Sequence, residues 1–283
     1  MKLIVKKESE LLEYLYENLD MPKKRVKQYL THGAIYVNNN RVKQYNYKVV
    51  PGMNIMIDTE SKNKKTLPFE VLFEDEHIIV VNKPSGLLTI ATAKEKERTL
   101  YHIVREYLVS KDNHAKVFIV HRLDKDTSGI VLFAKSEEIK RKFQDNWDNL
   151  VKVREYIAIV EGLPHKDKGT VRSWLKETKT LYVYSSNRMG DGKEAITHYR
   201  KVMGNKQFTM LDILIDTGRK NQIRVHMSDI GCPIIGDKKY NSKTNPIRRM
   251  GLHANKLVIN HPVTGKEMVF ESDLPNSFIK IVE

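Results

Sequence analysis

The sequence predicts an α+β fold with a mainly antiparallel or mixed sheet, preceded by a small helix-helix-hairpin module. Strand-like apolar runs dominate residues 69–283, and helical segments occur among them without the regular strand–helix alternation of a parallel sheet. Neither GxGxxG nor GxxxxGK[ST] occurs, which disfavours folds that bind nucleotide cofactors. The polar segment "DTESKNKKTLP" lacks periodicity and suits a linker, which we place at residues 61–68.

Residues 1–60 are predicted to form the small module. "ESELLEYLYENLD" places four leucines at helical spacing, which indicates a first helix. "MPKKRVKQYLTHG" begins a second helix, with Pro22 near its start and Gly33 just past its end. The alternating run "AIYVNNNRVKQYNYKVVPGMNIMI" then predicts a hairpin around the "NNN" turn.

The larger segment contains several recognisable elements. "TLYHIVREYLVS" is typical of an amphipathic helix, and "SEEIKRKFQDNWD" has the serine and the two acids of a helix start. "VREYIAIVEG" and "FTMLDILIDTG" are predicted strands, and "RKNQIRVHMSDIG", which follows the second, is predicted to be helical. "LHANKLVINHPVTGKEMVFES" predicts a hairpin.

The chain is strongly basic. It contains 49 lysine and arginine residues against 35 aspartate and glutamate residues, for a formal net charge of +14. Such a balance fits a solvated basic surface, or a polyanion partner whose counterions are released when lysine and arginine neutralise its phosphates. Charge alone does not separate RNA from DNA.

Several classes of protein are disfavoured by composition. Cys232 is the single cysteine, so no disulfide framework is expected and a cytoplasmic location is the simplest interpretation. No long uncharged apolar stretch suggests a membrane span. The 10 histidines show no His-Glu-x-x-His spacing, so no metal is expected. We also expect a monomer.

The stretch "HRLDKDTSGIVLFAKS" is the first candidate for chemistry. Asp126 and the residues Thr127–Gly129 supply good turn chemistry, and Ile130–Ala134 are predicted to form a core strand. That turn does not require Asp124 as well, and loops at strand ends commonly display functional residues. Asp124 is therefore either a catalytic carboxylate or one more polar turn residue.

A basic cluster and a strand tyrosine are the next candidates. Arg219, Lys220 and Arg224 are predicted at the start of a helix, where cations oppose the helix dipole. They are either solvated or in contact with an anion, and an arginine there could pair with a buried carboxylate. Tyr156 in "REYIAIV" is, by itself, as easily explained by core packing.

The five segments "VVNKPSGLLT", "HRLDKDTSGIVLFAKS", "REYIAIVEG", "TGRKNQIRVHMSDIGCPIIGD" and "GLHANKLVINHPVTGKEMVFES" together resemble, in order, the RluA-type pseudouridine synthases. This resemblance spans residues 79 to 271 and implies a pseudouridine synthase catalytic domain at 69–283. "KKRVKQYLTHGAIYVNNNRV" and "PGMNIMI" resemble the alpha-L RNA-binding motif, which implies an RNA-binding domain at residues 1–60.

The resemblance assigns roles to residues of the larger segment. It implies that Asp124 is the catalytic aspartate, that Tyr156 stacks on the target base, and that Arg219 is the ion-pair partner of the aspartate. The resemblance also implies that Arg122 and Leu252 bind the substrate. We add Arg224 from the basic cluster as a third substrate-binding residue.

One position departs from the family. Asn221 stands where the family often has histidine, and asparagine can hydrogen-bond but cannot be protonated, so we expect no acid–base role there. The Lys83-Pro84 turn is expected to shape the pocket.

In the small module the resemblance implies that the basic helix contacts RNA. The candidate contacts are Lys23, Lys24, Arg25, Lys27 and His32. Four cations within five residues repel one another unless an anion is bound, although a solvated, inert helix face is the simpler alternative.

The implied reaction is isomerisation of uridine in structured RNA, which is redox-neutral and for which we expect no cofactor. Large-subunit (23S) rRNA is the expected substrate, with tRNA as the alternative. A non-enzymatic RNA-binding ribosome-assembly factor is a second hypothesis. A glycosidase or nuclease is a third hypothesis. It is disfavoured because glycoside hydrolysis usually requires two carboxylates, and Asp124 is the one well-placed candidate.

Overall fold

A computed structural model describes residues 1–31, 33–58, 67–93 and 95–283. The chain divides into two compact units, Met1–Thr66 with Ser110–Asn113, and Leu67–Val109 with His114–Glu283. We call the first the small unit and the second the large unit. Most of the expected linker lies outside the described residues, so its boundaries stay a prediction. No helix in the described part is long and apolar enough to cross a membrane.

The small unit has the predicted order of helix, helix and hairpin. It contains β1 (Lys2–Ile4), β2 (Ser9–Glu10), α1 (Leu11–Asn18), α2 (Lys23–Thr31), β3 (Ile35–Val37), β4 (Asn40–Arg41), β5 (Lys48–Val49) and β6 (Asn54–Ile57). Four strands form a sheet in the order β1-β6-β3-β4, and β2 pairs with β5. Both helices bury leucines and Val26 against this sheet, which gives the unit its own core.

The predicted "NNN" turn is a two-residue hairpin between β3 and β4. Val37 pairs with Asn40, and the intervening Asn38 and Asn39 both have positive φ, at 48° and 65°. A two-residue hairpin with two positive φ angles favours asparagine and glycine, which explains why this sequence turns here.

The large unit is built on one mixed sheet. Its strands are β7 (Val71–Glu74), β8 (Ile78–Lys83), β9 (Phe118–Ile119), β10 (Ser128–Ala134), β11 (Val151–Glu161), β12 (Lys168–Glu177), β13 (Val183–Ser186), β14 (Lys193–Gly204), β15 (Phe208–Ile215), β16 (Leu252–Asn260) and β17 (Glu267–Glu271). The main path runs β13-β12-β14-β15-β11-β16-β10-β8-β7, with β17 beside β16 and β9 beside β10. Only the β10–β16 pair is parallel among the paired strands described, so the predicted α+β class is confirmed.

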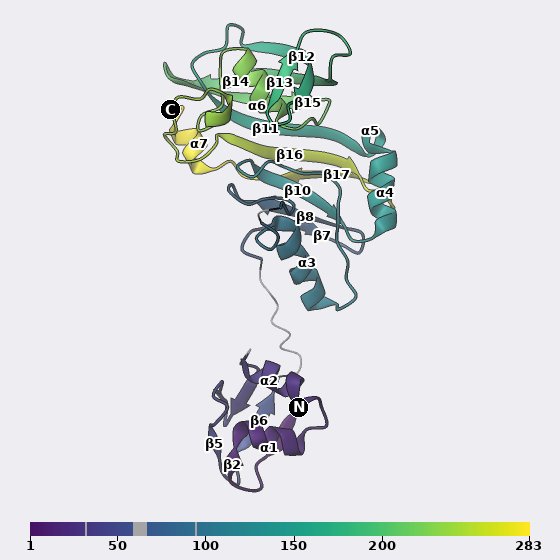
Figure 1. Cartoon of the computed structure of the whole chain (residues 1–283), viewed down its shortest axis with the longest axis vertical. Coiled ribbons are helices and arrows are strands. Elements are labelled where there is room, and N and C mark those ends of the chain that lie inside the picture. The colour runs from purple at the N-terminus through teal and green to yellow at the C-terminus, as the bar shows by residue number, and fades with distance from the viewer. Residues whose placement is uncertain (32, 59–66, 94) are drawn as a thin grey trace. The chain divides into compact units, whose positions relative to one another are not determined.

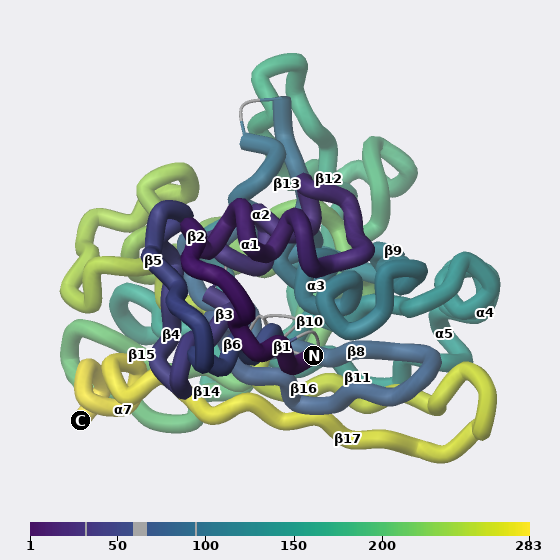
Figure 2. The backbone as a smooth tube through the Cα atoms, turned by 90° about the horizontal axis from the view of Figure 1, so that it is seen from below, coloured from purple at the N-terminus to yellow at the C-terminus, as the bar shows by residue number. Residues whose placement is uncertain are grey.

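The helices of the large unit cover parts of this sheet. They are α3 (Leu100–Lys111), α4 (Glu137–Asp145), α5 (Trp147–Leu150), α6 (Gln222–Asp229), the 3₁₀ helix η1 (Lys238–Tyr240) and α7 (Asn276–Lys280). Figure 1 shows β11 and β16 running through the middle of the unit, with α4 at one end and α7 at the other. The turn of the predicted β16–β17 hairpin lies at the α4–α5 end (Figure 2), where Asn260 donates to the carbonyl of Asn149 at 3.3 Å.

The β10 strand begins earlier than predicted. Ser128 and Gly129, which we expected in the turn, are already paired with His253 and Ala254 of β16. A Cβ on Gly129 would lie 2.1 Å from the carbonyl oxygen of Ala254, and its φ is +112°. Glycine is needed because the backbones of β10 and β16 approach closely just beyond Asp124.

Candidate active site

The loop that carries Asp124 is fixed on both sides of this residue. The hydroxyl of Thr89 donates to the carbonyl of Leu123 at 2.7 Å, and the N–H of Leu123 donates back at 3.2 Å. After Asp124, the ammonium group of Lys83 donates to the carbonyl of Lys125 at 3.0 Å. The backbone on which Asp124 stands is therefore held at two points, on either side of Asp124, by residues 83–89.

Lys83 gives the expected Lys83-Pro84 turn a definite structural role. Its side chain is fully buried, and it also donates to the carbonyls of Pro84 at 3.0 Å and Leu87 at 2.8 Å. Burial lowers the pKa of Lys83 to about 7, against the raising effect of the carboxylates of Asp126 and Asp124. Lys83 supports the pocket through backbone carbonyls, and it is not among the residues that line it.

Two donors converge on one oxygen of Asp124. The Asn221 amide donates to Oδ2 at 2.6 Å, and Nη1 of Arg224 donates to the same oxygen at 2.9 Å. The Asp124 side chain is 23% exposed. No described residue donates to its second oxygen, Oδ1. The carboxylate is thus oriented through one oxygen and open at the other.

Arg224 is held in place by a second carboxylate. Its Nε and Nη2 atoms donate to the two oxygens of Asp237 at 2.6 and 2.8 Å, the two-point geometry in which arginine–carboxylate pairs are strongest. The guanidinium also stacks on the ring of Tyr240, 4.9 Å from its centroid. Asp237 is almost fully buried. Burial opposes the charge of Arg224, but the carboxylates of Asp237 and Asp124 raise its pKa overall.

The prediction that Arg219 pairs with Asp124 is wrong, because Arg224 is the partner. Helix α6 begins at Gln222, so Arg219 and Lys220 lie in the preceding turn. Arg219 is exposed and donates through Nε to the carbonyl of Glu194 at 2.9 Å. It lines the pocket without an ion pair to a described residue.

Asn221 connects Asp124 to Tyr240. It precedes α6 in the left-handed conformation, with φ of 56°, which asparagine tolerates better than most residues. The Tyr240 hydroxyl donates to Oδ1 of Asn221 at 3.3 Å, so the amide nitrogen faces Asp124. Asn221 thereby acts as a hydrogen-bond donor to the carboxylate, and its lack of an acid–base role stays a prediction.

Asp124 lies in a pocket of about 700 Å³ in the large unit. The pocket brings together all the residues of the large unit that the sequence assigned to the site: Arg122, Asp124, Tyr156, Arg219, Arg224 and Leu252. Arg122 is exposed, whereas Leu252 is buried in an apolar cluster with Ile223 against which Tyr156 packs. The pocket therefore combines one carboxylate, several cations and an apolar wall.

Tyr156 lies on β11 between β15 and β16, opposite Ile213 and Ala254. Burial raises the pKa of its hydroxyl to about 12, and nearby Asp124 adds to this effect, while Arg154 opposes it. The phenol therefore remains protonated at any ordinary pH, and the ring presents a neutral aromatic surface in the pocket.

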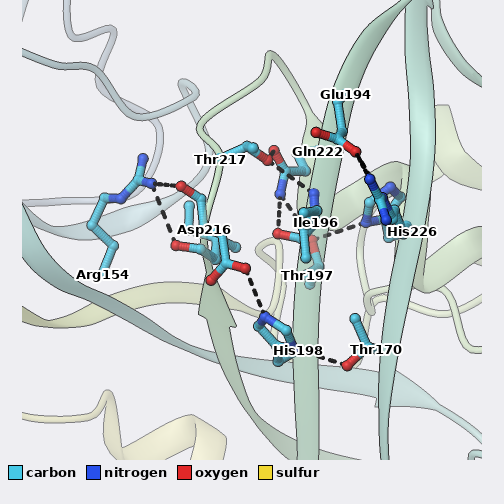
Figure 3. Close-up of polar contacts among 12 residues, drawn as sticks. Arg154, Thr170, Glu194, Ile196, Thr197, His198, Asp216, Thr217, Gln222 and His226 are labelled. Carbon is cyan, nitrogen blue, oxygen red and sulfur yellow. Dashed lines mark hydrogen bonds and ion pairs between the residues drawn. The ribbon is translucent and has the colours of Figure 1, made fainter. Parts of the chain in front are cut away.

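A buried polar network fixes α6 on the sheet (Figure 3). Gln222 donates to the carbonyl of Ile196 at 2.9 Å and to the hydroxyl of Thr197 at 3.0 Å. One turn later, the ring of His226 bridges the hydroxyls of Thr197 and Ser173, each at 2.9 Å. Because α6 carries Arg224 and begins just after Asn221, this network sets the position of both donors to Asp124.

The basic helix α2 of the small unit exposes four cations, and their contact with RNA stays a prediction. Lys23, Lys24, Arg25 and Lys27 lie on α2 and are exposed, and within the described residues none of them forms an ion pair. Lys23 lies over the ring of Tyr16 at 5.2 Å, and Arg25 over Tyr29 at 6.0 Å. His32 lies outside the described residues.

Sequence reasoning missed four residues of this site. Asp237 and Tyr240 anchor the donors to Asp124, and Trp147 and Arg154 line the pocket. Asp237 and Tyr240 gave no local signal. In the part of the chain that the structure describes, no three histidine, cysteine, aspartate or glutamate side chains are grouped to hold a metal ion.

Comparison with known proteins identifies the family. The RNA pseudouridylate synthase family matches residues 77–229, and the S4 domain family matches residues 14–55. The relatives include an uncharacterised RNA pseudouridine synthase of Bacillus subtilis, YlyB, which is 32% identical over 93% of this chain and 89% of its own length. The ribosomal large subunit pseudouridine synthase D of Zymomonas mobilis is 35% identical over 74% of this chain and 70% of its own length.

A solved structure supports the fold. Human RNA pseudouridylate synthase domain containing 4 superposes with a TM-score of 0.63 at 23% identity, over 77% of this chain and 93% of its own length. The family match, the relatives and the fold agree with the resemblance that the five sequence segments carry. The chain is an enzyme of the RluA family of RNA pseudouridine synthases and carries an S4 RNA-binding domain at its N-terminus.

Proposed function

We propose that this enzyme converts a uridine of large-subunit rRNA into pseudouridine, with the uridine flipped into the pocket and ionised Asp124 acting on its sugar. The observation that carries the proposal is the arrangement of Asp124, which is held through Oδ2 by Asn221 and Arg224 in a pocket that also contains Tyr156. A carboxylate oriented through one oxygen has its other oxygen available for reaction.

The reaction explains why the pocket needs an aromatic ring and an apolar wall. Conversion breaks the bond between C1′ and N1, turns the uracil, and joins C1′ to C5, which loses its proton while N1 gains one. The target base must leave its stack to be reached. The ring of Tyr156 would replace the lost stacking, which is worth about 1–3 kcal/mol per base on aromatic platforms. Leu252 would contact the uracil while it turns.

Asp124 would react through Oδ1 in one of two ways. It attacks C1′ as a nucleophile, or it removes the C2′ proton to give a glycal. Both routes need the carboxylate without its proton, and an adjacent arginine favours that form. Arg224 supplies this charge, and Asp237 prevents it from turning away.

The cations at the mouth of the pocket and on α2 would bind the RNA. Arg122 and Arg219 line the pocket and are exposed, so they are placed to contact phosphates on either side of the flipped nucleotide. Lys23, Lys24, Arg25 and Lys27 would add contacts from the S4 domain.

The choice of rRNA rests on the relatives. Proteins of Zymomonas mobilis and Salmonella typhimurium that resemble this chain carry the name ribosomal large subunit pseudouridine synthase D. A tRNA uridine is the second candidate substrate, because members of the RluA family modify either large-subunit rRNA or tRNA. The cytoplasmic location, the monomeric state and the absence of a cofactor stay predictions.

Pseudouridine mapping of rRNA and tRNA from cells with and without the protein tests this proposal. We expect at least one pseudouridine of large-subunit rRNA to be absent without the protein and restored by the purified enzyme. Loss of a tRNA pseudouridine alone would show that tRNA, and not large-subunit rRNA, is the substrate. An unchanged map together with defective ribosomes would support a binding protein instead.

A further inference from the structure

Two arginines of the large unit stack on the two tryptophans of the chain, but their surroundings differ. On β12, Arg172 lies over Trp174 at 5.8 Å and donates to the carboxylate of Glu194 at 2.7 Å. On β11, Arg154 lies over Trp147 at 5.5 Å. The charge of Arg172 is compensated outside the pocket, whereas Arg154 and Trp147 both line the pocket that contains Asp124.

Arg154 is a half-buried cation without a carboxylate partner among the described residues. Its Nη2 donates to the carbonyls of Asp216 at 2.6 Å and Ile215 at 3.3 Å, which fixes the guanidinium (Figure 3). No described residue accepts from Nε or Nη1. Burial lowers the pKa of Arg154. Because buried charges in proteins are normally paired, this arrangement indicates an anionic ligand.

The surroundings make room for this guanidinium. A Cβ on Gly218 would lie 2.6 Å from Nη1 of Arg154, so a larger residue there would require this guanidinium to shift. The carboxylates of Asp148 and Asp216 raise the pKa of Arg154 against the effect of burial, but neither forms an ion pair with it. Asp216 accepts from the ring of His198 at 3.0 Å, and Asp148 is exposed on α5. Nε and Nη1 of Arg154 thus keep their donors for a ligand in the pocket.

The position of Arg154 relates its ligand to the flipped nucleotide. Arg154 and Tyr156 are two residues apart on β11, so their side chains leave the same face about 7 Å apart along the strand. Both side chains also line the pocket that contains Asp124. An anion on Arg154 would therefore belong to the backbone beside a uridine stacked on Tyr156.

We propose that Arg154, held by Trp147, binds a phosphodiester adjacent to the target uridine. Nη1 keeps its N–H donors for a phosphate oxygen, and the planar guanidinium is held in a fixed direction by Trp147 and by the two carbonyls on Nη2. The contact would position the substrate for Asp124 without reading the base sequence. This inference rests on the proposed function, because it requires the flipped uridine to occupy the pocket.

The test measures binding of a 23S rRNA transcript to the full-length protein over a range of salt concentrations. Arg154→Met is expected to weaken binding about tenfold and to reduce the slope of log affinity against log salt by about 0.7–0.9, the value of one phosphate contact. Arg172→Met is the matched control, because it removes an arginine that stacks on a tryptophan outside the pocket. It is expected to keep the wild-type slope.

Arg154→Lys separates charge from geometry and guards against misfolding of the methionine variant. It keeps a cation but loses the planar guanidinium that Trp147 and the two carbonyls hold, so we expect a near wild-type salt slope with weaker binding, and a higher KM with little change in kcat. If Arg154 has only a structural role, both variants should be less stable than the wild type and both should keep the wild-type salt slope. That result would overturn the proposal.

A fluorescence measurement provides a second readout without turnover. Trp174→Phe leaves Trp147 as the only tryptophan of the chain, which has two. The transcript is expected to change the emission of Trp147, and much less so after Arg154→Met. If wild-type protein forms no pseudouridine but these binding effects occur, Arg154 binds an RNA phosphate, but the proposed function fails and with it the assignment of that phosphate to a target uridine. If pseudouridine forms and neither binding effect occurs, only the phosphate site fails.

Discussion

Asp124 accepts both of its described hydrogen bonds on one carboxylate oxygen, and both donors come from the N-terminal end of α6. Asn221 and Arg224 are three residues apart, the spacing that places side chains on one side of a helix. We predicted Arg219 as the ion-pair partner, and the start of α6 at Gln222 is what places Arg224 there instead. The family resemblance located the basic segment, but the choice within it depended on where α6 begins.

Removing each arginine tests this assignment. Arg224→Met is expected to abolish most activity and to destabilise the large unit by about 3–5 kcal/mol, because it leaves Asp237 buried without a partner. Arg219→Met keeps the Asp124 pair, so it should chiefly raise KM and leave stability almost unchanged. Steady-state kinetics and urea unfolding measure both effects. Equal loss of kcat in the two variants would contradict the assignment.

In the wild type the amide nitrogen of Asn221 lies 2.6 Å from Oδ2 of Asp124. Asn221→Asp replaces this donor by a second carboxylate. Two carboxylates this close share a proton, so we expect kcat to fall by about 10²-fold or more near pH 7 and the pH profile to change shape. Asn241→Asp is the control, since Asn241 is also left-handed but is exposed and lies outside the pocket. It should leave kcat unchanged. A wild-type pH profile for Asn221→Asp would show that the amide does not position Asp124.

At the scale of elements, α6 is held on the sheet by hydrogen bonds that the sequence pattern did not reveal. The helix, the β16–β17 hairpin and the strands β11 and β15 were predicted because their apolar residues follow a clear period. The strands β12, β13 and β14 were not predicted. Their residues are mostly exposed or half-buried rather than fully buried, so their apolar pattern is weak.

His226 makes the attachment of α6 dependent on pH. Burial lowers its pKa from 6.5 to about 4, so the folded state favours the neutral ring. Its stabilising contribution is present above pH 6.5 and is lost as the pH falls toward 4, with a limit of about 3 kcal/mol. His226→Gln cannot titrate, and we expect it to reduce the loss of unfolding free energy between pH 6.5 and 4.

Urea unfolding followed by tryptophan fluorescence measures this effect, because both tryptophans belong to the large unit. His165→Gln, at an exposed histidine, is the control and should retain the wild-type pH dependence. An unchanged pH dependence in His226→Gln would mean that other groups dominate acid destabilisation.

At the scale of the whole molecule, the S4 domain and the catalytic unit have separate cores. Their order and families were predictable because each carries its own motifs. The boundary between the two domains was less predictable, because a polar segment without periodicity does not indicate at which residue a domain ends. The basic helix α2 gives the S4 domain a set of exposed cations that no described carboxylate compensates.

Deleting residues 1–60 should therefore weaken RNA binding far more than it affects catalytic folding. If the four cations of α2 each contact a phosphate, the salt slope should fall by up to about 3. Tryptophan-detected unfolding of the truncated protein should remain close to that of the full chain. Unchanged affinity and slope after deletion would remove the RNA-binding role from this domain.

The central claim is that Asp124 performs the chemistry in this pocket, and Asp124→Asn tests it most directly. The variant keeps the size of the side chain and an oxygen, but it cannot carry the negative charge that either route requires. Pseudouridine formation in 23S rRNA by the purified variant is the measurement. We predict no detectable product, with the fold and RNA affinity retained, and measurable turnover by Asp124→Asn would contradict the account.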